Sequence, residues 1–349
     1  MVNNNVIPFG PGGAEDISEI DKSQLPDYQR EMLETIEAMD EYAHTRGTLG
    51  GFDTGYPALN DAMEGLNTGL ILIAGQSNVG KSAFCMQLGW QVSQKNKVPT
   101  KDNPNKAYVL YFSLDDNAND LLPRCISIDQ KIPINVVKYP AKYKHKENLI
   151  RKRASGIQRL KDSIDCFKMV DATKGDSIEY IEQQIRATTL QLKQTEERSK
   201  LVVFIDNFHD ISVRDQSFSG DNAKYDFLAG ELSRICTIYD IPIVCTAEFR
   251  KLNGTRRPTV DDIRESTKIG YEAKAVLLCY NEVGLRGESA NVFWEQAGVG
   301  KCPILEVRVG KNKFSSFKGR IFYEFEPAKS ILNEAPEDRA TRYSQMITS

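Results

Sequence analysis

The sequence of 349 residues lacks the patterns that would indicate disulfides, a metal cluster or a membrane span. Its seven cysteines are scattered and none stands in a C-x-x-C pair, which favours free, buried thiols. The three histidines, His44, His145 and His209, are isolated and have no metal-binding spacing. No apolar run approaches the ~18 residues that cross a bilayer, and the N-terminus has no signal-peptide pattern. We therefore expect a cytoplasmic protein without a membrane partner.

Net charge is also nearly absent. The sequence has 45 Lys+Arg against 48 Asp+Glu, a formal net charge of -3, so the whole chain gives no hint of a polyanionic partner. Any nucleic-acid surface must therefore be local. The hydrophobic content of 40% is typical of a globular chain that can bury a sizeable core.

The first 48 residues differ from the rest. Residues 1–25 hold a GPGG run and an acidic stretch with few large apolar groups, which predicts a mobile arm. Within 26–48, Tyr28, Met32 and Ile36 recur at four-residue steps, which predicts one amphipathic helix. Pattern alone leaves two interpretations open: the helix packs on its own domain, or it docks on a neighbouring subunit.

Residues 49–327 alternate between apolar runs and helical stretches, which predicts one α/β domain with a mainly parallel sheet covered on both faces. The predicted strands are 70–74, 108–113, 201–206, 241–246, 275–280 and 305–309. The predicted helices are 81–94, 177–195 and 225–239. Residues 328–349 are charged and have no strand pattern, so we expect a surface tail.

The segment GQSNVGKS fits the P-loop pattern G-x-x-x-x-G-K-[ST], and an apolar strand precedes it while a helical stretch follows. Backbone N–H groups and the helix N-terminus of such a loop bind phosphates. We expect Lys81 to reach the β- and γ-phosphates and the Ser82 hydroxyl to bind Mg²⁺. The residues predicted to bind ATP are Gly75, Gln76, Ser77, Asn78, Val79, Gly80, Lys81 and Ser82.

Acidic residues end two other predicted strands. Asp206 follows five apolar residues in LVVFID, which makes it the candidate Walker B acid for the metal. Asp115 and Asp116 end YVLYFSLDD, at the sheet edge where ligands bind in open α/β folds. Spacing alone does not choose between these two carboxylates as the group that activates water, nor does it separate them from a solvated acidic turn.

The order of these features resembles that of the replicative hexameric DNA helicases of the DnaB type, from bacteria and phages. The resemblance covers about residues 48–326, the RecA-like motor domain, and is most specific in RPTVDDIRESTKIGYEAKAVLLCYNE. It also includes IPIVCTAEFRK and VRVGKNKFSSFKGRIFYEF. The family usually has a helical N-terminal collar of over a hundred residues, whereas here only about 48 residues precede the motor. Residues 26–48 stand in the place of the family's linker helix, so the resemblance favours docking on a neighbouring subunit.

The resemblance implies a role for each matching position. Asp115 stands where the family has its catalytic glutamate, and Glu248 where it has a glutamine that senses the γ-phosphate. Lys311 and Lys313 match the finger residues that enter the neighbouring subunit's nucleotide site. Arg264 and Glu265 match the loop that faces single-stranded DNA in a ring. A cytoplasmic hexamer is implied, in the host cytoplasm for a phage protein, with primase and a helicase loader as further partners.

Three positions depart from the family pattern. Asp115 is one methylene shorter than glutamate, so its carboxylate lies about 1.5 Å further back. Glu248 is an acid that repels a γ-phosphate, and Lys313 lacks the bidentate fork of arginine. We expect intact ATP binding and slow ATP hydrolysis.

Two loops are candidates for contact with single-stranded DNA phosphates. One is 212–224, which is rich in small polar residues. The other is 250–264, with Arg250, Lys251, Arg256, Arg257 and Arg264. A third basic stretch, 138–161, has nine Lys or Arg against Glu147 alone, and its helical spacing favours a solvated outer face.

The sequence therefore predicts an ATP-dependent DNA helicase subunit. Two other functions stay open: a RecA-like ATPase that binds DNA without unwinding it, such as a recombination mediator or loader, and a nucleotide-gated ring scaffold.

Overall fold

The computed structural model describes residues 23, 25–45, 49–100, 104–195, 199–250, 256–264, 267–296 and 299–348. The chain divides into two units, Met1–Arg46 and Gly47–Ser349. None of the described helices is long and apolar enough to cross a membrane.

The first unit contains one helix, α1 (Asp27–Thr45), as the sequence predicts. Four large apolar side chains of α1 are solvent-exposed: Tyr28, Met32, Ile36 and Met39. They lie three or four residues apart and so form one stripe. Acidic residues Asp27, Glu31, Glu34 and Glu37 stand between them. The predicted arm, residues 1–25, lies almost wholly outside the described residues.

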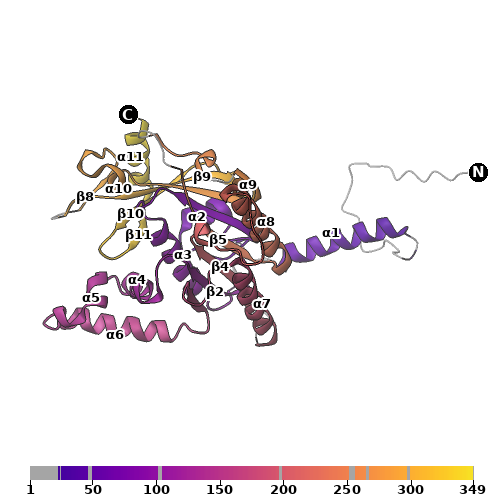
Figure 1. Ribbon diagram of the computed structural model, residues 1–349, viewed down its shortest axis with the longest axis horizontal. Helices are drawn as coiled ribbons and strands as arrows, with labels where there is room; N and C mark the ends of the chain where they lie inside the picture. The colour runs from indigo at the N-terminus through magenta and orange to yellow at the C-terminus, as the bar shows by residue number, and fades with distance from the viewer. Residues whose placement is uncertain are drawn as a thin grey trace, which may run out of the picture. The chain divides into compact units, whose positions relative to one another are not determined.

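The second unit is built on a sheet flanked by helices (Figure 1). The sheet has nine strands with the order β11-β10-β9-β6-β1-β5-β4-β2-β3. The six strands from β6 to β3 are parallel, and β9, β10 and β11 each pair antiparallel with their neighbours. The strands are β1 (Gly69–Gly75), β2 (Lys106–Ser113), β3 (Phe167–Asp171), β4 (Ser199–Asp206), β5 (Pro242–Glu248), β6 (Ala275–Tyr280), β9 (Ile304–Asn312), β10 (Arg320–Glu326) and β11 (Ile331–Glu334). A separate hairpin consists of β7 (Trp294–Gln296) and β8 (Gly300–Cys302). The predicted α/β class with a mainly parallel sheet is confirmed.

Helices cover both faces of this sheet. Successive strand residues point to opposite sides, so each strand contributes side chains to the core on each face. In β1, Ile71 and Ile73 pack in a core with α3, whereas Leu70 and Leu72 pack in a second core with α7 and α8. The helices are α2 (Pro57–Met63), α3 (Lys81–Lys95), α4 (Ala118–Gln130), α5 (Ile134–Lys138), α6 (Glu147–Lys161), α7 (Ile178–Thr195), α8 (Asp221–Tyr239), α9 (Thr267–Glu272), α10 (Glu282–Arg286) and α11 (Glu337–Thr348). Short 3-10 turns are η3 (Pro140–Tyr143), η4 (Phe208–Asp210), η5 (Val260–Asp262) and η6 (Gly287–Ser289).

The prediction that residues 328–349 form a surface tail is wrong. Residues 331–334 form β11, which extends the sheet beyond the predicted domain end at 327, and 337–348 form α11. Tyr343 of α11 is buried against Phe322, and its hydroxyl donates to Glu324 Oε1 at 2.6 Å. The strand is too short for a period-two pattern to stand out, and the apolar side of α11 is narrow among charged residues.

All seven cysteines are free and buried, as expected. Burial raises the pKa of each thiol, for example to about 12 for Cys125 and Cys279. The described residues contain no group of histidine, cysteine and acidic side chains that could hold a metal ion by itself.

Candidate functional site

The P-loop connects β1, which ends at Gly75, to α3, which begins at Lys81. Two backbone positions depend on glycine. A Cβ at Gly75 would lie 2.9 Å from Cγ2 of Val79, and Gly80 has a φ of 108°, a left-handed value that glycine adopts without strain. The loop therefore wraps closely enough for its N–H groups to face a phosphate.

Lys81 lies inside this loop with only 7% of its surface exposed. Its Nζ donates to the carbonyl oxygen of Gln76 at 2.8 Å and lies 3.9 Å from Oε1 of Glu248. Burial lowers the pKa of Lys81, and the negative charge of Glu248 offsets part of that effect. The ammonium group is thus held where a phosphate oxygen would meet it.

Asp206 ends β4 and is almost completely buried, with 6% of its surface exposed. Burial raises the pKa of its carboxyl, while hydrogen bonds from Thr246 and Ser82 and the charge of Lys81 lower it. A carboxylate beside a serine hydroxyl is a suitable pair of oxygen ligands for Mg²⁺ or its water shell. The predicted metal residues Ser82 and Asp206 therefore lie together.

The two acidic residues after β2 differ in their surroundings. Asp116 is paired with Arg124, whose Nη2 lies 3.1 Å from its Oδ2. The Asp115 side chain is exposed, and its charge helps to raise the pKa of Asp210, after the larger effect of burial. Asp115 is thus the carboxylate free to approach a water molecule, in agreement with the position that the resemblance implies.

Glu248 joins the P-loop to the segment after β5. The Ser77 hydroxyl donates to its Oε1 at 2.9 Å, and Nη1 of Arg264 lies 3.9 Å from its Oε2. The backbone N–H of Arg264 also donates to the Glu248 carbonyl at 2.9 Å. One side chain therefore contacts both the phosphate-binding loop and the candidate DNA segment.

The predicted basic residues of 250–264 separate into two groups. Arg250 and Arg264 are exposed. Arg256 makes a two-fold ion pair with the buried Asp262, at 2.7 and 2.5 Å, and this pairing is the main reason that the Asp262 pKa falls to about 2. Lys251 and Glu265 lie outside the described residues.

Arg257 is held by acidic groups of its own chain. Its Nε donates to Glu306 Oε2 at 3.0 Å, its Nη2 lies 3.6 Å from Glu282 Oε2, and its guanidinium lies 4.8 Å from the ring centre of Tyr280. Because Glu306 and Glu282 are buried, Arg257 neutralises charges inside the fold. Contact between Arg257 and DNA, as the sequence predicted, does not fit this placement.

The two finger residues lie far from the P-loop of the same chain. Lys311 pairs with Val276 at the start of β6, whereas Cys279, near the end of β6, pairs with Gly75. Nζ of Lys311 donates to the carbonyls of Gly270 and Tyr271 at 2.8 and 2.7 Å, so it caps the end of α9. Lys313 is exposed. Both residues therefore lie at the opposite sheet edge from their own nucleotide site.

A family model, the DnaB-like helicase C-terminal domain, matches residues 51–326. The chain belongs to this family.

Relatives of this DnaB-like domain are replicative helicases. The chain is 24% identical to the replicative DNA helicase DnaB of Rickettsia typhi over 256 residues, which is 72% of this chain and 49% of the relative. It is 23% identical to the replicative DNA helicase DnaC of Bacillus subtilis over 256 residues, 72% of this chain and 52% of that one. The chain thus spans about half the length of the curated relatives it matches.

Solved structures agree with the fold. One of them, an isolated ATPase domain, has a TM-score of 0.72 at 18% identity, and the match covers 89% of this chain and 100% of that domain. A DnaB-like replicative helicase, solved to show its interactions with primase, has a TM-score of 0.70 at 19% identity, and the match covers 88% of this chain and 66% of that one. Membership of a family of ATP-dependent DNA helicases makes the P-loop of this DnaB-like domain a nucleotide-binding site.

The polar residues that support this nucleotide site are not marked by any sequence pattern. Asn281 is buried after β6, and its Nδ2 donates to the Val79 carbonyl at 3.2 Å, which ties the P-loop to α10. Thr246 on β5 donates to Asp206. Both stand inside or beside apolar strands where nothing in the sequence distinguishes them from core residues.

His209 is held within the fold through both of its ring nitrogens. Its Nδ1 accepts from the Glu248 N–H at 3.3 Å, and its Nε2 lies 3.3 Å from the Arg264 carbonyl oxygen. The imidazole therefore connects the turn after β4 to Glu248 at the end of β5 and to Arg264 in the candidate DNA segment. Its spacing of three residues from Asp206 was the available signal.

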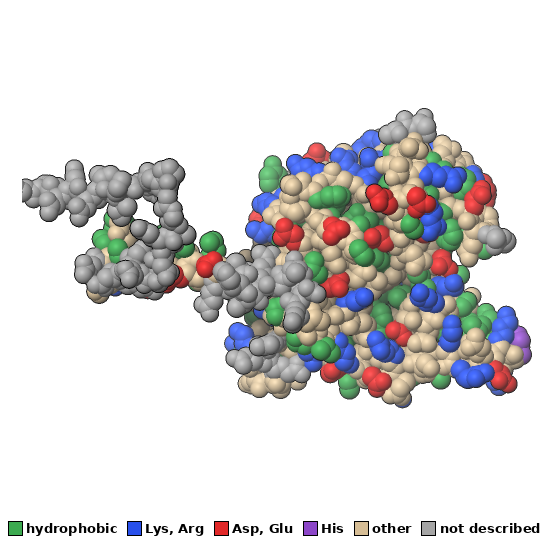
Figure 2. Space-filling model, turned by 180° about the vertical axis from the view of Figure 1, so that it is seen from behind, with side chains coloured by type: hydrophobic (Ala, Val, Ile, Leu, Met, Phe, Trp, Pro, Cys, Tyr) green, Lys and Arg blue, Asp and Glu red, His purple; other side chains and the backbone are tan. Residues whose placement is uncertain are grey.

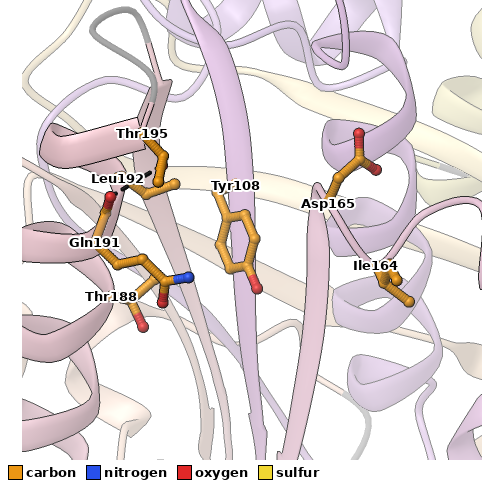
Figure 3. A pocket seen from close by; sticks show the side chains of 7 residues that line it. All are labelled: Tyr108, Ile164, Asp165, Thr188, Gln191, Leu192 and Thr195. Atoms are coloured by element: carbon orange, nitrogen blue, oxygen red, sulfur yellow. Dashed lines mark hydrogen bonds between the residues drawn. The ribbon is translucent and has the colours of Figure 1, made fainter.

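A small cavity of about 220 Å³ lies away from this nucleotide site (Figure 3). It is at the amino ends of β2 and β3 and beside the last turns of α7, whereas the P-loop is at the carboxyl edge of the sheet. Its lining residues are Tyr108, Ile164, Asp165, Thr188, Gln191, Leu192 and Thr195. The Asp165 carboxylate is paired with Lys97 at 2.9 Å. This cavity therefore takes no part in binding nucleotide at the P-loop.

Proposed function

We propose that the chain is the motor subunit of a ring-shaped replicative DNA helicase, which couples ATP hydrolysis to movement along single-stranded DNA. The supporting observation is the position of Glu248. Its carboxylate contacts Ser77 and Lys81 in the P-loop and Arg264 in the candidate DNA segment. A change in charge at the nucleotide would therefore alter the interaction between Glu248 and Arg264, the residue proposed to face DNA.

The chemistry follows from the residues at the carboxyl edge of the sheet. Lys81 and the P-loop N–H groups bind the β- and γ-phosphates, while Ser82 and Asp206 would hold Mg²⁺ and its water shell. Bound Mg²⁺ neutralises charge that develops on the phosphates. Asp115 orients the attacking water and accepts its proton as oxygen bonds to the γ-phosphorus. The bond to the bridging oxygen breaks, and ADP and phosphate leave.

Lys311 and Lys313 act on the nucleotide of a neighbouring subunit in this proposal. Their place at the opposite sheet edge from the P-loop of the same chain supports action across an interface. Lys313 is exposed and available, whereas Lys311 must exchange the α9 carbonyls for a phosphate when the interface closes. An isolated subunit would therefore hydrolyse ATP very slowly.

Subunit contact through α1 completes the ring in this proposal. Its apolar stripe Tyr28, Met32, Ile36 and Met39 is exposed, which supports docking on a neighbouring subunit. A hexamer is proposed from the family, as are a primase or a loader as further partners.

The proposed path for single-stranded DNA uses Arg250, Lys251, Arg264 and Glu265, together with the loop 212–224. Arg256 supports this surface by fixing Asp262 at its base. Arg257 is removed from the path because of its buried ion pairs.

A nucleotide-gated ring scaffold is the second candidate, and Glu248 is also the observation that favours it. An anionic group 3.9 Å from the P-loop lysine opposes a γ-phosphate and slows turnover. In a scaffold, binding of ATP without hydrolysis would drive ring assembly.

Assays of ATP hydrolysis and of strand displacement on a forked DNA test the proposal. We expect DNA-stimulated hydrolysis and unwinding by the full chain, and neither activity in Lys81→Ala or Lys313→Ala. Assembly with a non-hydrolysable ATP analogue, but hydrolysis equal to that of Lys81→Ala, would identify the scaffold. Hydrolysis with DNA binding but no strand displacement would identify a recombination mediator or loader.

A further inference from the structure

The helical layer formed by η3 and α6 concentrates positive charge. Between 138 and 161 there are nine Lys or Arg and Glu147 alone, although the chain as a whole has a net charge of -3. The rest of the chain therefore has an excess of acidic residues, and charge is unevenly distributed along the sequence. Figure 2 shows basic side chains gathered at the lower right, where α5 and α6 lie when the view of Figure 1 is turned.

Five lysines of this layer are exposed and have no carboxylate within 4.0 Å among the described residues. We call them the basic surface: Lys142, Lys144, Lys146, Lys152 and Lys161. Like charges that lie close together on α6 and on the residues just before it repel one another. A surface that only needs to be soluble would intersperse acidic residues.

The layer that carries the basic surface is packed against the rest of the fold. It has its own apolar cluster, in which Ile126, Val136 and Val137 pack against Leu149 and Leu160. Gly156 brings α6 close to α4, since a Cβ there would lie 2.6 Å from Cγ2 of Ile126. The lysines are thus presented from a fixed platform.

We propose that the basic surface binds the phosphate backbone of duplex DNA. This site goes beyond the proposed function, which assigns only single-stranded DNA to the chain. The 15 residues of α6 are about 22 Å long. Over that length a duplex carries about 13 phosphate charges, at one per ~1.7 Å. Ammonium groups that are not paired with carboxylates suit such contacts, which hold a duplex without reading its sequence.

The composition of the surface distinguishes a nucleic-acid partner from a protein partner. Tyr139 is the single exposed large hydrophobic residue within the fully described segment 138–161. A protein interface needs an apolar centre and is depleted in lysine, whereas DNA interfaces are polar and positively charged. The apolar stripe of a helix such as α1 would find no apolar acceptor here.

Duplex DNA is favoured over a single strand for a similar reason. Surfaces for single strands combine a groove with several stacked aromatic rings, whereas the described segment 138–161 exposes one tyrosine ring, Tyr139, and one imidazole, His145. It is also separate from the proposed single-strand path. Arg250 and Arg264 of that path lie at the carboxyl end of β5, whereas α6 packs on α4, which lies beside β3, three positions away in the strand order.

The test compares the full-length chain with the triple variant Lys144→Gln, Lys146→Gln, Lys152→Gln. A matched control removes three exposed lysines elsewhere: Lys168→Gln, Lys174→Gln, Lys193→Gln. Binding of a labelled blunt duplex of about 20 base pairs and of a labelled single strand of the same length is measured over a range of salt concentrations. Circular dichroism and basal ATP hydrolysis check that both variants are folded.

We expect the triple variant to bind duplex about tenfold more weakly and its salt slope to fall by roughly 2 to 3, from the loss of about 0.9 per phosphate contact. Single-strand binding and basal hydrolysis should match those of the control. Duplex affinity equal to that of the control would overturn the proposal, as would an equal loss for both probes. A changed oligomeric state with unchanged duplex affinity would assign the surface to a protein partner instead. Lys81→Ala should keep duplex binding, so failure of the proposed function would be seen separately.

Discussion

We expect Glu248 to limit the affinity for nucleotide. Its carboxylate lies 3.9 Å from Nζ of Lys81 and offsets part of the burial effect that lowers the Lys81 pKa. Glu248→Gln keeps the size of the side chain and removes the charge that opposes a γ-phosphate. We expect ATP to bind about tenfold more tightly, which corresponds to ~1.4 kcal/mol. Titration with a fluorescent ATP analogue measures this, and Glu295→Gln, on an exposed strand, is the matched control. Weaker binding by Glu248→Gln would contradict the argument.

Asp206 is an ionisable residue that is almost completely buried. Burial raises its pKa above that of the unfolded chain, so the folded state binds the proton more tightly. The contribution of Asp206 to the free energy of unfolding therefore falls as the pH rises from the pKa of the unfolded chain through the higher pKa of the folded chain. At pH 7 the ionised carboxylate destabilises the folded state. We expect Asp206→Asn to raise the free energy of unfolding at pH 7 by about 1 kcal/mol and to abolish hydrolysis.

Thermal unfolding without nucleotide measures the stability of Asp206→Asn. The difference from the natural chain should shrink as the pH falls toward the unfolded pKa of about 4, because the folded carboxyl, whose pKa is raised, is then protonated. A lower melting temperature for the variant at pH 7 would show that hydrogen bonds to the ionised carboxylate outweigh its burial.

The segment 256–264 is anchored by an ion pair. Pairing with Arg256 lowers the Asp262 pKa to about 2, so the stabilisation is present above the unfolded pKa of about 4 and is lost as the pH falls through about 2. We expect Arg256→Ala to lower the melting temperature at pH 7 and to have little effect near pH 2. A loss that is equal at both pH values would contradict the ion-pair explanation. The exposed Arg250→Ala is the control.

The C-terminal helix α11 is part of the folded domain. Tyr343 is 3% exposed and packs on Phe322, so Tyr343→Ala should destabilise the chain by about 3 kcal/mol through loss of buried contacts. Tyr343→Phe removes only the hydrogen bond to Glu324 and should cost about 1 to 2 kcal/mol. Chemical unfolding measures both. Equal, negligible effects would mean that α11 contributes nothing to stability.

Parts of the site that are marked by a short continuous motif could be predicted from the sequence. GQSNVGKS and LVVFID place Lys81 and Asp206 at strand ends, and parallel topology then brings those ends together. The hydrogen-bond partners of Asn281, Thr246 and His209 could not be predicted, because they are far away in sequence, 39 residues for His209 and 202 for Asn281. The four-residue β11 was missed for a related reason, since it is defined by pairing with β10 and by hydrogen bonds between Leu332 and Gln87.

At the scale of the whole molecule, the finger residues and the P-loop lie at opposite edges of one sheet. If Lys313 acts across an interface, subunits carrying Lys81→Ala still supply an intact finger, and subunits carrying Lys313→Ala an intact P-loop. We expect each variant alone to be inactive and an equal mixture to recover about a quarter of the natural hydrolysis rate, as random neighbours would form about one complete site in four.

The mixture must be assembled before ATP is added, and hydrolysis is then compared with that of each variant alone. A mixture of Lys81→Ala with Asp206→Asn serves as the control, because both changes affect the same half of the site and should not complement. Full inactivity of the first mixture would contradict action of Lys313 across an interface.

The seven buried cysteines have a practical consequence for studying such an assembly. Every thiol is sheltered and has a raised pKa, so almost none is present as the reactive thiolate at neutral pH. Maleimide dyes should therefore leave the natural chain unlabelled. A single change such as Asn148→Cys, at an exposed position of α6, would accept one fluorophore, and the motion of that helix against DNA could be followed by energy transfer without first removing any native cysteine.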